Sequence, residues 1–280
     1  MSDLDKKIES AIKLINAVAK MAERRGEVLE LAYSGGKDSD VLLQLARMSG
    51  AKFVARHKIT TIDPAGTLAH ARENGVEIVK PKISFTDIIT KFGLPSRKYR
   101  ICCKLLKEYK TAYFVITGIR QAESQRRKSK YTDISLCKQF SKGEYEEQFL
   151  PILYWTNEDV REFIERYRLK VHRLYYNNNK LDVSQRLGCM GCPLLSHKNR
   201  IKSFQKYPKM ILFYLKAMQK HFETHPTKAS AYKDVCEWLY FDLYLHGNKK
   251  ELAKIRESNF DSKTFFETTY NIKIELNKYG

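Results

Sequence analysis

One short segment carries the residue types of an anion-binding loop: Ser34, Gly35, Gly36, Lys37, Asp38 and Ser39. Adjacent glycines let the backbone turn tightly and point N–H groups at a phosphate, and a helix that begins after them adds its positive end. The serine hydroxyls add hydrogen-bond donors and the lysine adds charge. The segment is not a common P-loop, because Asp38 follows the lysine and Leu31 stands at the position of the first glycine. The spacing therefore predicts a phosphate site of another kind.

Cysteines form the second set of residues suited to chemistry, and they are Cys102, Cys103, Cys137, Cys189, Cys192 and Cys236. No export signal is visible, so we expect a reducing cytosol and free thiols rather than disulfides. The spacing Cys189-x-x-Cys192 is shared by zinc, iron–sulfur and redox sites, and the adjacent pair Cys102-Cys103 brings the number of thiolates to four. Metal binding is therefore the favoured role.

Four soft thiolates select either an iron–sulfur cluster or zinc. Adjacent cysteines strain one tetrahedral zinc ion more than they strain a 4Fe-4S cluster, whose four irons are separate corners. We therefore expect the adjacent pair and the C-x-x-C pair to bind a 4Fe-4S cluster, with zinc or no metal as alternatives. Cys137 is an alternative ligand that would replace one member of the adjacent pair. Cys236, flanked by Val235 and Trp238, is expected to be buried in a helix.

Alternating strands and helices must position these residues. Periodic and continuous apolar runs predict a first helix over residues 3–24 and strands over 28–33, 51–60, 76–79 and 113–117. Further helices are expected over residues 40–48, 64–74, 86–92 and 102–110. This alternation predicts an α/β fold with a doubly wound, mostly parallel sheet that binds ligands at the carboxyl ends of its strands. The loop at residues 34–39 follows the first strand and occupies such an end.

Two domains are expected along the chain. Residues 1–193 would form the α/β domain, with an N-terminal helix at 1–26 and a mobile, basic, substrate-facing segment at 119–149. Residues 194–280 would form a helical C-terminal region. Thr156 is the predicted N-cap of a helix that reaches about Tyr167, and Asp159 is its acidic partner.

The chain is strongly basic, with 51 Lys and Arg against 32 Asp and Glu and a formal net charge of +19. Residues 91–130 alone hold twelve basic and two acidic residues. Such an excess favours an anionic partner such as nucleic acid, and an ordinary solvated surface is the alternative. No apolar run is long enough to cross a bilayer, so we expect a cytoplasmic protein without a membrane partner.

The loop after the first strand resembles the pyrophosphatase loop (PP-loop) of the adenine nucleotide alpha hydrolase superfamily. Further blocks resemble the phosphoadenosine phosphosulfate (PAPS) reductase family, in the same order along the chain: Thr61-Ile62-Asp63-Pro64, Arg100 to Lys107, Thr117-Gly118-Ile119-Arg120, and Arg186 to Pro193. The resemblance covers about residues 28–210 and is closest to cysteine-rich members of the family.

The resemblance implies an enzyme whose residues 1–193 bind an adenine nucleotide, with PAPS, adenylyl sulfate (APS) or ATP as candidates. The loop would hold the nucleotide together with Asp63, Gly118, Arg120 and Arg127. Lys37 and Arg120 would have catalytic roles, and Mg²⁺ would accompany ATP. The CC…CxxC arrangement resembles the 4Fe-4S site of assimilatory APS reductases.

The chain departs from the reductase pattern at its C-terminus, which reads Glu275-Leu276-Asn277-Lys278-Tyr279-Gly280. Reductases of the family carry a nucleophilic cysteine in a short C-terminal tail, and this thiol is missing here. Cys137, or a cysteine of a partner, is then the candidate nucleophile for reduction with a thiol reductant such as thioredoxin.

Three functions remain open on these grounds. The first is a PAPS or APS reductase-like oxidoreductase. The second is an ATP-using sulfurtransferase, or another modifying enzyme, that acts on nucleic acid and releases AMP or pyrophosphate. The third is a non-catalytic nucleotide- or iron–sulfur-binding subunit of a larger assembly. The oligomeric state is not predicted.

Overall fold

The computed structural model describes residues 2–139 and 144–275, and its contacts group the chain into two compact units. The first unit comprises Met1–Ile59, Pro64–Lys80 and Glu108–Leu187. The second comprises Thr60–Asp63, Pro81–Lys107 and Gly188–Gly280. The expected domain boundary at residues 193 and 194 stays a prediction.

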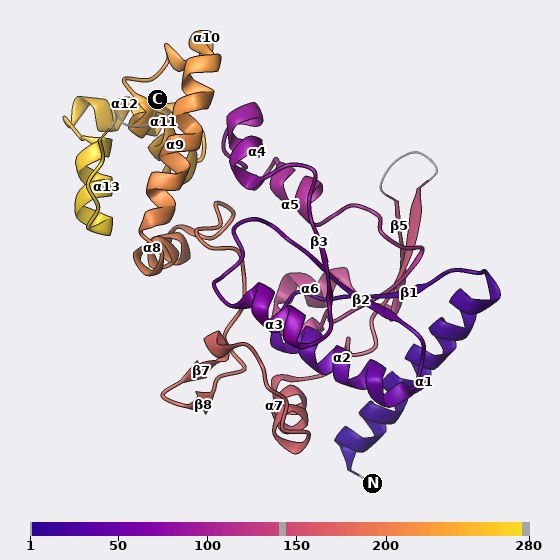
Figure 1. Ribbon diagram of the computed structural model, residues 1–280. Coiled ribbons are helices and arrows are strands. Elements are labelled where there is room, and N and C mark those ends of the chain that lie inside the picture. The colour runs from indigo at the N-terminus through magenta and orange to yellow at the C-terminus, as the bar shows by residue number, and fades with distance from the viewer. Residues whose placement is uncertain (1, 140–143, 276–280) are drawn as a thin grey trace. The chain divides into compact units, whose positions relative to one another are not determined.

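The first unit is built on a six-stranded sheet (Figure 1). Its spatial order is β3 (Glu77–Val79), β2 (Val54–Lys58), β1 (Leu29–Ala32), β4 (Phe114–Thr117), β6 (Tyr145–Phe149) and β5 (Ser135–Gln139). All neighbouring pairs are parallel except β5 and β6, which are antiparallel. The chain runs from β1 toward β2 on one side and from β4 toward β6 on the other. The sheet is therefore doubly wound, as predicted, and β1 and β4 flank its switch point.

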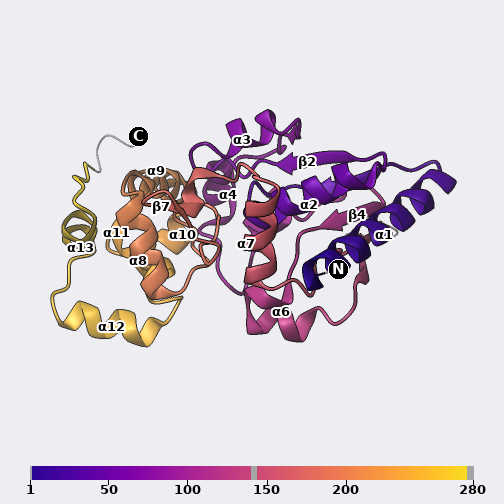
Figure 2. The same cartoon turned by 90° about the horizontal axis from the view of Figure 1, so that it is seen from below.

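Helices and a small hairpin complete the first unit: α1 (Asp3–Arg24), α2 (Lys37–Ser49), α3 (Thr67–Glu73), α6 (Gln125–Lys130), α7 (Asn157–Arg166), the 3-10 turns Gln121–Glu123 and Arg173–Tyr175, and strands β7 (Tyr176–Asn177) and β8 (Lys180–Leu181). Helix α1 buries residues three and four positions apart, from Leu4 to Ala22, which is why this segment is helical. Helices α1, α2 and α7 lie together on the sheet (Figure 2). All four residues of β4 are buried, as expected for a central parallel strand.

The segment at residues 119–149 differs from its expected irregular form. It contains α6 and the antiparallel strands β5 and β6, which extend the sheet beyond the four strands predicted. Both strands are rich in polar residues and lack the apolar run that identifies a central strand. Strand β5 lies at the edge of the sheet, whereas β6 pairs with both β4 and β5. Residues 140–143 lie outside the described residues, and the mobility of the segment stays a prediction.

The predicted cap of α7 is present and also connects this helix to α1. The Thr156 side chain accepts a hydrogen bond from the Asp159 amide, and the Asp159 carboxylate accepts one from the Thr156 amide. Lys7 of α1 pairs with the same carboxylate at 2.9 Å. Burial tends to raise the pKa of Asp159, but the Thr156 hydrogen bonds and the Lys7 charge outweigh it, so that the pKa is lowered.

Replacing Asp159 by Asn is therefore expected to lower the free energy of unfolding at pH 7 by about 1 kcal/mol. A carboxylate whose pKa is lowered by folding contributes stability that is complete above its unfolded pKa of about 4 and is lost as the pH falls. Urea unfolding of both proteins should show the difference shrinking toward pH 3. The control Glu158→Gln, in the same turn but exposed, should change little. A difference that stays constant with pH would contradict this account.

The second unit is helical and has its own apolar core. Its helices are α4 (Phe85–Phe92), α5 (Ile101–Leu106), α8 (His197–Lys206), α9 (Lys209–Thr224), α10 (Pro226–Ala229), α11 (Val235–Tyr244), α12 (Lys249–Glu257) and α13 (Ser262–Tyr270). Helix α4 packs against α9, which joins residues 81–107 to the C-terminal helices. The aromatic rings of Phe85, Phe204 and Tyr214 lie at the centre of this core. The predicted helical C-terminal region is thus confirmed for its described residues.

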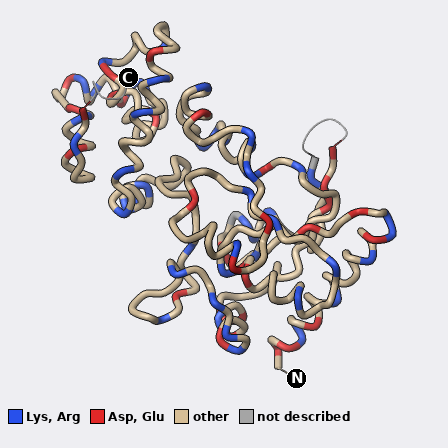
Figure 3. The backbone as a smooth tube through the Cα atoms, viewed as in Figure 1, with Lys and Arg blue, Asp and Glu red and all other residues tan. Residues whose placement is uncertain are grey.

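Basic residues are spread over both units (Figure 3). The basic window at residues 91–130 is divided between them, because residues up to Lys107 belong to the second unit and residues from Glu108 to the first. The run of charge along the sequence is therefore not one patch on one unit. Across the residues that the structure describes, no helix combines the length and apolarity needed to span a bilayer.

Candidate functional site

The loop between β1 and α2 has a backbone that only glycine can adopt. Gly35 has φ +76°, and a Cβ there would stand 2.8 Å from the Thr67 Cγ2 atom. A Cβ on Gly36 would stand 3.1 Å from the Tyr175 hydroxyl oxygen. Either side chain would displace a neighbour, so glycine is required by conformation and space at Gly35 and by space at Gly36. The predicted tight turn is therefore present.

The start of α2 presents backbone donors beside this turn. Gly36 is the N-cap and supplies no side-chain hydrogen bond to the first turn of the helix. Ser39 is buried, and its hydroxyl donates to the Gly36 carbonyl at 2.7 Å, whereas Ser34 is exposed. Ser39 therefore shapes the loop from within. The Gly36 amide donates to the Ser34 hydroxyl and the Ser39 amide to the Gly36 carbonyl, so Ser34 and the remaining loop amides are the groups suited to an anion.

Lys37 and Asp38 of the loop form a largely buried chain of charges with Arg120. The Lys37 Nζ atom lies 3.0 Å from Asp38 Oδ2, and Arg120 Nε lies 2.7 Å from Asp38 Oδ1. Burial lowers the pKa of Lys37, although Asp38 opposes this effect. The Arg120 side chain is fully buried, and its other nitrogens donate to the Trp155 carbonyl and to Asn157 Oδ1, both at 3.0 Å. In this structure Arg120 holds Asp38 in place, and its predicted catalytic role stays a prediction.

Two other arginines offer charge nearer to solvent. Arg127 and Arg186 both pair with Glu123, which also accepts a hydrogen bond from the Arg120 amide. Burial lowers the pKa of Arg127, and the neighbouring charge of Arg186 adds to this effect. Arg186 also acts on the pKa of Lys37, so it lies close to the loop. Arg186 was not predicted as a ligand, although it begins one of the blocks that resemble the reductase family; the side chain of the next residue, Leu187, packs against Gly35.

Gly118 and Asp63 have structural partners that explain their residue types. A Cβ on Gly118 would stand 2.9 Å from the Asp38 carbonyl oxygen, so glycine permits the close approach of β4 to α2. Asp63 accepts hydrogen bonds from the Thr60 amide and hydroxyl, both at 2.7 Å, and belongs with the second unit. Their predicted contacts with a nucleotide stay predictions.

A buried polar network on α2 was not anticipated. The Asp40 Oδ1 atom accepts hydrogen bonds from the Tyr33 hydroxyl and from His70 Nε2, the latter at 2.9 Å. Burial raises the pKa of Asp40. The network ties α2 to the end of β1 and to α3, which fixes the loop on both sides. Only the fold brings these residues together, because His70 lies thirty positions from Asp40.

The C-x-x-C segment in the second unit is held by α8 and α9. Gly191 has φ +57°, and its amide donates to the Ser203 hydroxyl at 3.1 Å while its carbonyl accepts from the Tyr214 hydroxyl at 2.7 Å. Arg200 donates to the carbonyls of Pro193 and Leu195, at 3.0 and 2.7 Å. The backbone that carries Cys189 and Cys192 is therefore held by hydrogen bonds with α8 and α9.

All four predicted ligands belong to this unit, and their thiols interact electrostatically. The hydrogen bond with Cys103 and burial raise the pKa of Cys102. The same hydrogen bond lowers the pKa of Cys103 to about 6; burial opposes this shift, and Arg100, 3.4 Å from the sulfur, supports it. Burial raises the pKa of Cys192 to about 11. The fold thus collects residues that are 86 positions apart between Cys103 and Cys189.

The surroundings of these thiols suit an anionic group. Arg200 is fully buried, and its Nε and Nη1 atoms have no hydrogen-bond partner among the described residues. Its pKa is lowered mainly by burial, and Cys192 is among the groups that oppose this shift. A buried cation with unpaired donors needs a negative neighbour, which thiolates that bind a metal would supply. Within the described ranges, however, no three His, Cys, Asp or Glu side chains are already arranged around a single ion. The charge and donor type of these residues suit a thiolate-bound cluster, whereas the positions of their side chains in this structure do not form a metal site.

The two remaining cysteines lie elsewhere. Cys137 is exposed on β5 and belongs to the first unit, and its predicted roles as ligand or nucleophile stay untested. Cys236 is fully buried in α11, which confirms the sequence-based expectation.

Two uncharacterized proteins of Methanocaldococcus jannaschii are similar to this chain. One is 27% identical over 228 residues, which are 74% of this chain and 51% of that protein. The other is 26% identical over 230 residues, which are 75% of this chain and 45% of that protein. The chain therefore spans about half the length of these relatives.

Two solved structures resemble the chain at low sequence identity. Phosphoadenylyl-sulfate (PAPS) reductase from Candida auris, in a phosphate complex, is 18% identical with a TM-score of 0.44 and covers 68% of this chain and 96% of its own. NMN synthetase from Francisella tularensis is 16% identical with a TM-score of 0.39 and covers 61% of this chain and 73% of its own. At such scores neither likeness carries an argument about this chain.

The family assignment rests on a longer match. Residues 29–195, more than half of the chain, match the phosphoadenosine phosphosulfate reductase domain. The match begins at β1, includes the glycine turn before α2, and ends just beyond the C-x-x-C segment. The chain belongs to the phosphoadenosine phosphosulfate reductase domain family.

Proposed function

We propose that this chain is an enzyme that binds an adenine nucleotide on the loop Ser34–Ser39 and acts on the α-phosphate side of it, with PAPS or APS as substrate. The observation that carries the proposal is the loop, where Gly35 and Gly36 pack closely against Thr67 and Tyr175 and α2 begins without a side-chain cap. Loop amides and the end of α2 would bind the phosphate, and Lys37, Arg127 and Arg186 would neutralise its charge.

The reductase reaction needs a thiolate that attacks the sulfur of the adenylyl sulfate. The sulfur–oxygen bond to the nucleotide breaks, the nucleoside phosphate leaves with the electron pair, and the thiol becomes an S-sulfonate. A dithiol reductant of the thioredoxin class then attacks the sulfur of the S-sulfonated cysteine. The bond to the sulfonate breaks, sulfite leaves, and a disulfide forms between the reductant and the cysteine. Cys137, exposed on β5, is the thiol of this chain that we assign to the attack. The C-terminal residues 276–280, where the family carries its thiol, lie outside the described residues.

We further propose that Cys102, Cys103, Cys189 and Cys192 hold a 4Fe-4S cluster, with zinc as the alternative. When bound, such a cluster would supply an electron-rich group that assists sulfur chemistry. Arg200 and Lys107 would lie near it as positive charges. Burial tends to lower the pKa of Lys107, but the negative charges of Cys189, Asp63 and Cys103 outweigh it and raise the pKa.

A second candidate function is ATP-dependent sulfur transfer to nucleic acid. The net charge of +19 favours it, because an enzyme of a small sulfate ester does not need so large an excess. Here ATP, with Mg²⁺, would activate an acceptor oxygen as its adenylate, and sulfur would displace AMP. The products distinguish the two functions: sulfite from an adenylyl sulfate with thioredoxin, or AMP or pyrophosphate from ATP only when nucleic acid is present. Activity in neither assay would favour a non-catalytic binding subunit.

Nucleotide binding by the loop is tested with the variant Gly35→Ala. Its Cβ would meet Thr67 and its backbone would be strained, so we expect the affinity for PAPS, APS or ATP to fall at least about tenfold. Gly75→Ala is the matched control, because Gly75 also has a positive φ but has open space around it. Isothermal titration of both variants checks this prediction. If Gly35→Ala and Gly75→Ala bound the nucleotide with equal affinity, the loop would not be the nucleotide site.

The metal is tested by anaerobic purification with iron and sulfide analysis and an absorption spectrum. Ser in place of any of the four proposed ligands is expected to remove most of the iron, since a cluster loses a corner with each thiolate. Cys137→Ser and Cys236→Ser are the controls and should retain it. A colourless, zinc-bound protein would exclude the cluster, and iron lost from Cys137→Ser would assign that residue to the ligand set.

A further inference from the structure

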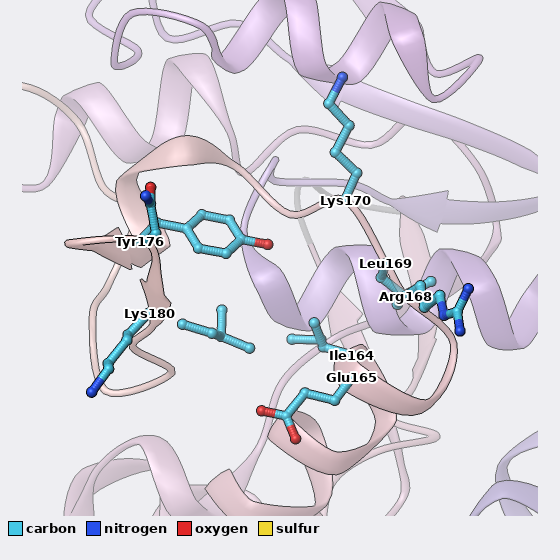
Figure 4. Close-up of a pocket in the computed structure, with 9 residues that line it drawn as sticks. Ile164, Glu165, Arg168, Leu169, Lys170, Tyr176 and Lys180 are labelled. Atoms are coloured by element: carbon cyan, nitrogen blue, oxygen red, sulfur yellow. The ribbon is translucent and has the colours of Figure 1, made fainter.

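A pocket of about 670 Å³ lies in the first unit between the end of α7 and the hairpin of β7 and β8. None of the loop residues Ser34–Ser39 lines it, so it is a second site. Its volume is in the range of small-molecule sites, which is about 300–1,000 Å³. Its apolar floor is formed by Ile164, Leu169, Tyr176 and Leu181. Charged side chains lie around this floor (Figure 4).

The floor is built by a hairpin of defined register. Asn178 and Asn179 both have positive φ, as the type I′ turn of a two-residue hairpin requires. In this register Tyr176 lies opposite Leu181, which directs both side chains to one face. Figure 4 shows the Tyr176 ring directed across the pocket toward Ile164 at the end of α7. An exposed aromatic ring thus faces an aliphatic wall, an arrangement suited to a flat ring between them.

The rim of the pocket is basic. Arg168, Lys170 and Lys180 surround the floor with Glu165 as the one acidic member of the lining, and the three basic side chains extend on different sides (Figure 4). Lys170 pairs with Glu73 at 3.2 Å. The carbonyl end of α7 accounts for a cation at Arg168, because helix C-termini favour positive charge. It does not account for Lys180, which comes from the hairpin.

Two consecutive tyrosines connect the loop Ser34–Ser39 to the pocket, because Tyr175 contacts the loop and Tyr176 lines the pocket. The Tyr175 side chain is buried against the loop. A Cβ added to Gly36 would stand 3.1 Å from the Tyr175 hydroxyl oxygen, and the Lys37 amine lies 5.3 Å from the centre of the Tyr175 ring. The next residue, Tyr176, is 42% exposed and lines the pocket. A ligand in the pocket would therefore contact a strand that is directly continuous with the wall of the loop.

We propose that this pocket binds one nucleotide of a single-stranded nucleic acid, with the base against Tyr176 and the aliphatic floor and its phosphates near Lys180 and Arg168. A flat aromatic group joined to phosphates is the chemistry that complements an exposed ring, an apolar wall and a basic rim. The net charge of +19 favours a polyanion over a free nucleotide as its source. The inference is independent of which adenylyl compound occupies the loop Ser34–Ser39.

The test is fluorescence anisotropy of the full chain with labelled short single strands of RNA and DNA, at several salt concentrations. Tyr176→Ala is expected to weaken binding about tenfold and Tyr176→Phe to leave it unchanged, because stacking needs the ring and not the hydroxyl. Lys180→Glu is expected to weaken binding and to flatten its salt dependence. Lys52→Glu makes the same charge change at an exposed lysine outside the pocket and should have little effect.

Several results would overturn the proposal. One is an equal loss from Lys52→Glu and Lys180→Glu, which would indicate diffuse attraction by net charge. Another is unchanged binding by Tyr176→Ala, or no binding of either strand by the wild-type chain. Competition by AMP that depends on Tyr176 would identify a free nucleotide as the ligand instead. Titration of the same variants with PAPS, APS and ATP measures the loop separately, so failure of the pocket and failure of the proposed function give different results.

Discussion

Replacing Arg120 by Ala is expected to lower the free energy of unfolding by about 3–5 kcal/mol, the largest effect that we predict for a single residue. The Arg120 side chain is fully buried and bonds to Asp38, the Trp155 carbonyl and Asn157. Its removal would leave the buried pair of Lys37 and Asp38 without the cation that orients it and would open a cavity beside the loop. Urea unfolding measures the loss, and nucleotide titration should show weaker binding in the same variant.

Arg120→Lys separates charge from geometry. One amine keeps the positive charge but cannot reach three partners that the guanidinium contacts through Nε and both Nη atoms, so we expect little recovery of stability. Arg127→Ala is the control, because Arg127 pairs with Glu123 in a partly exposed position and should cost less than about 1 kcal/mol. If Arg120→Ala kept its stability and lost only nucleotide binding, Arg120 would be a ligand residue and not a structural one.

The unfolding experiment on Arg120 matters because the sequence alone could not distinguish a ligand-binding role of this residue from a structural one. Arg120 follows a glycine at the end of a buried strand, a position typical of ligand-binding residues. Its partners Trp155 and Asn157 lie 35 and 37 positions away in the sequence, so no local pattern predicts these contacts. An arginine that binds an anion and one that orients a carboxylate have the same local sequence, and only the packed structure separates them.

The loop itself was predictable because its determinants are local. A buried strand, two glycines and a polar helix start specify a turn whose shape depends on a few consecutive φ and ψ values. The presence of the central strands β1, β2 and β4 was also predicted from the sequence, whereas their spatial order in the sheet was not. Strands β5 and β6 were missed because both are rich in polar residues and lack an apolar run; of the two, β5 lies at the edge of the sheet, where polar residues are common.

The two cysteine pairs were selected as ligands from their spacing and from the family resemblance, whereas the residues that surround them could not be predicted. Spacing identified the C-x-x-C pair, and resemblance joined it to the adjacent pair upstream. The buried Arg200 with two unpaired nitrogens gave no signal in the sequence, where it is one of many basic residues in a polar helix. Burial makes it informative, because an unpaired cation is costly away from water and ordinary on the surface.

The second large effect is expected from Gly191→Ala in the C-x-x-C segment. Alanine at φ +57° is strained by about 1 kcal/mol, and its Cβ would stand 2.6 Å from the Phe204 ring and 3.2 Å from the Met210 Cβ atom. Overpacking in a core adds about 1–3 kcal/mol, so we expect a total loss of about 2–4 kcal/mol. The Phe204 ring is fully buried, which leaves it little room to move aside.

Gly188→Ala provides the matched control three residues earlier. A Cβ there meets no atom within 4 Å, so stability should change by less than about 0.5 kcal/mol. Urea unfolding and iron content should be measured on both variants after anaerobic purification. Loss of stability and of iron together in Gly191→Ala would mean that the backbone contacts of Ser203 and Tyr214 set the geometry of the ligands. Loss of stability with full iron content would mean that the metal can order this segment without them, since metal binding contributes its own folding free energy.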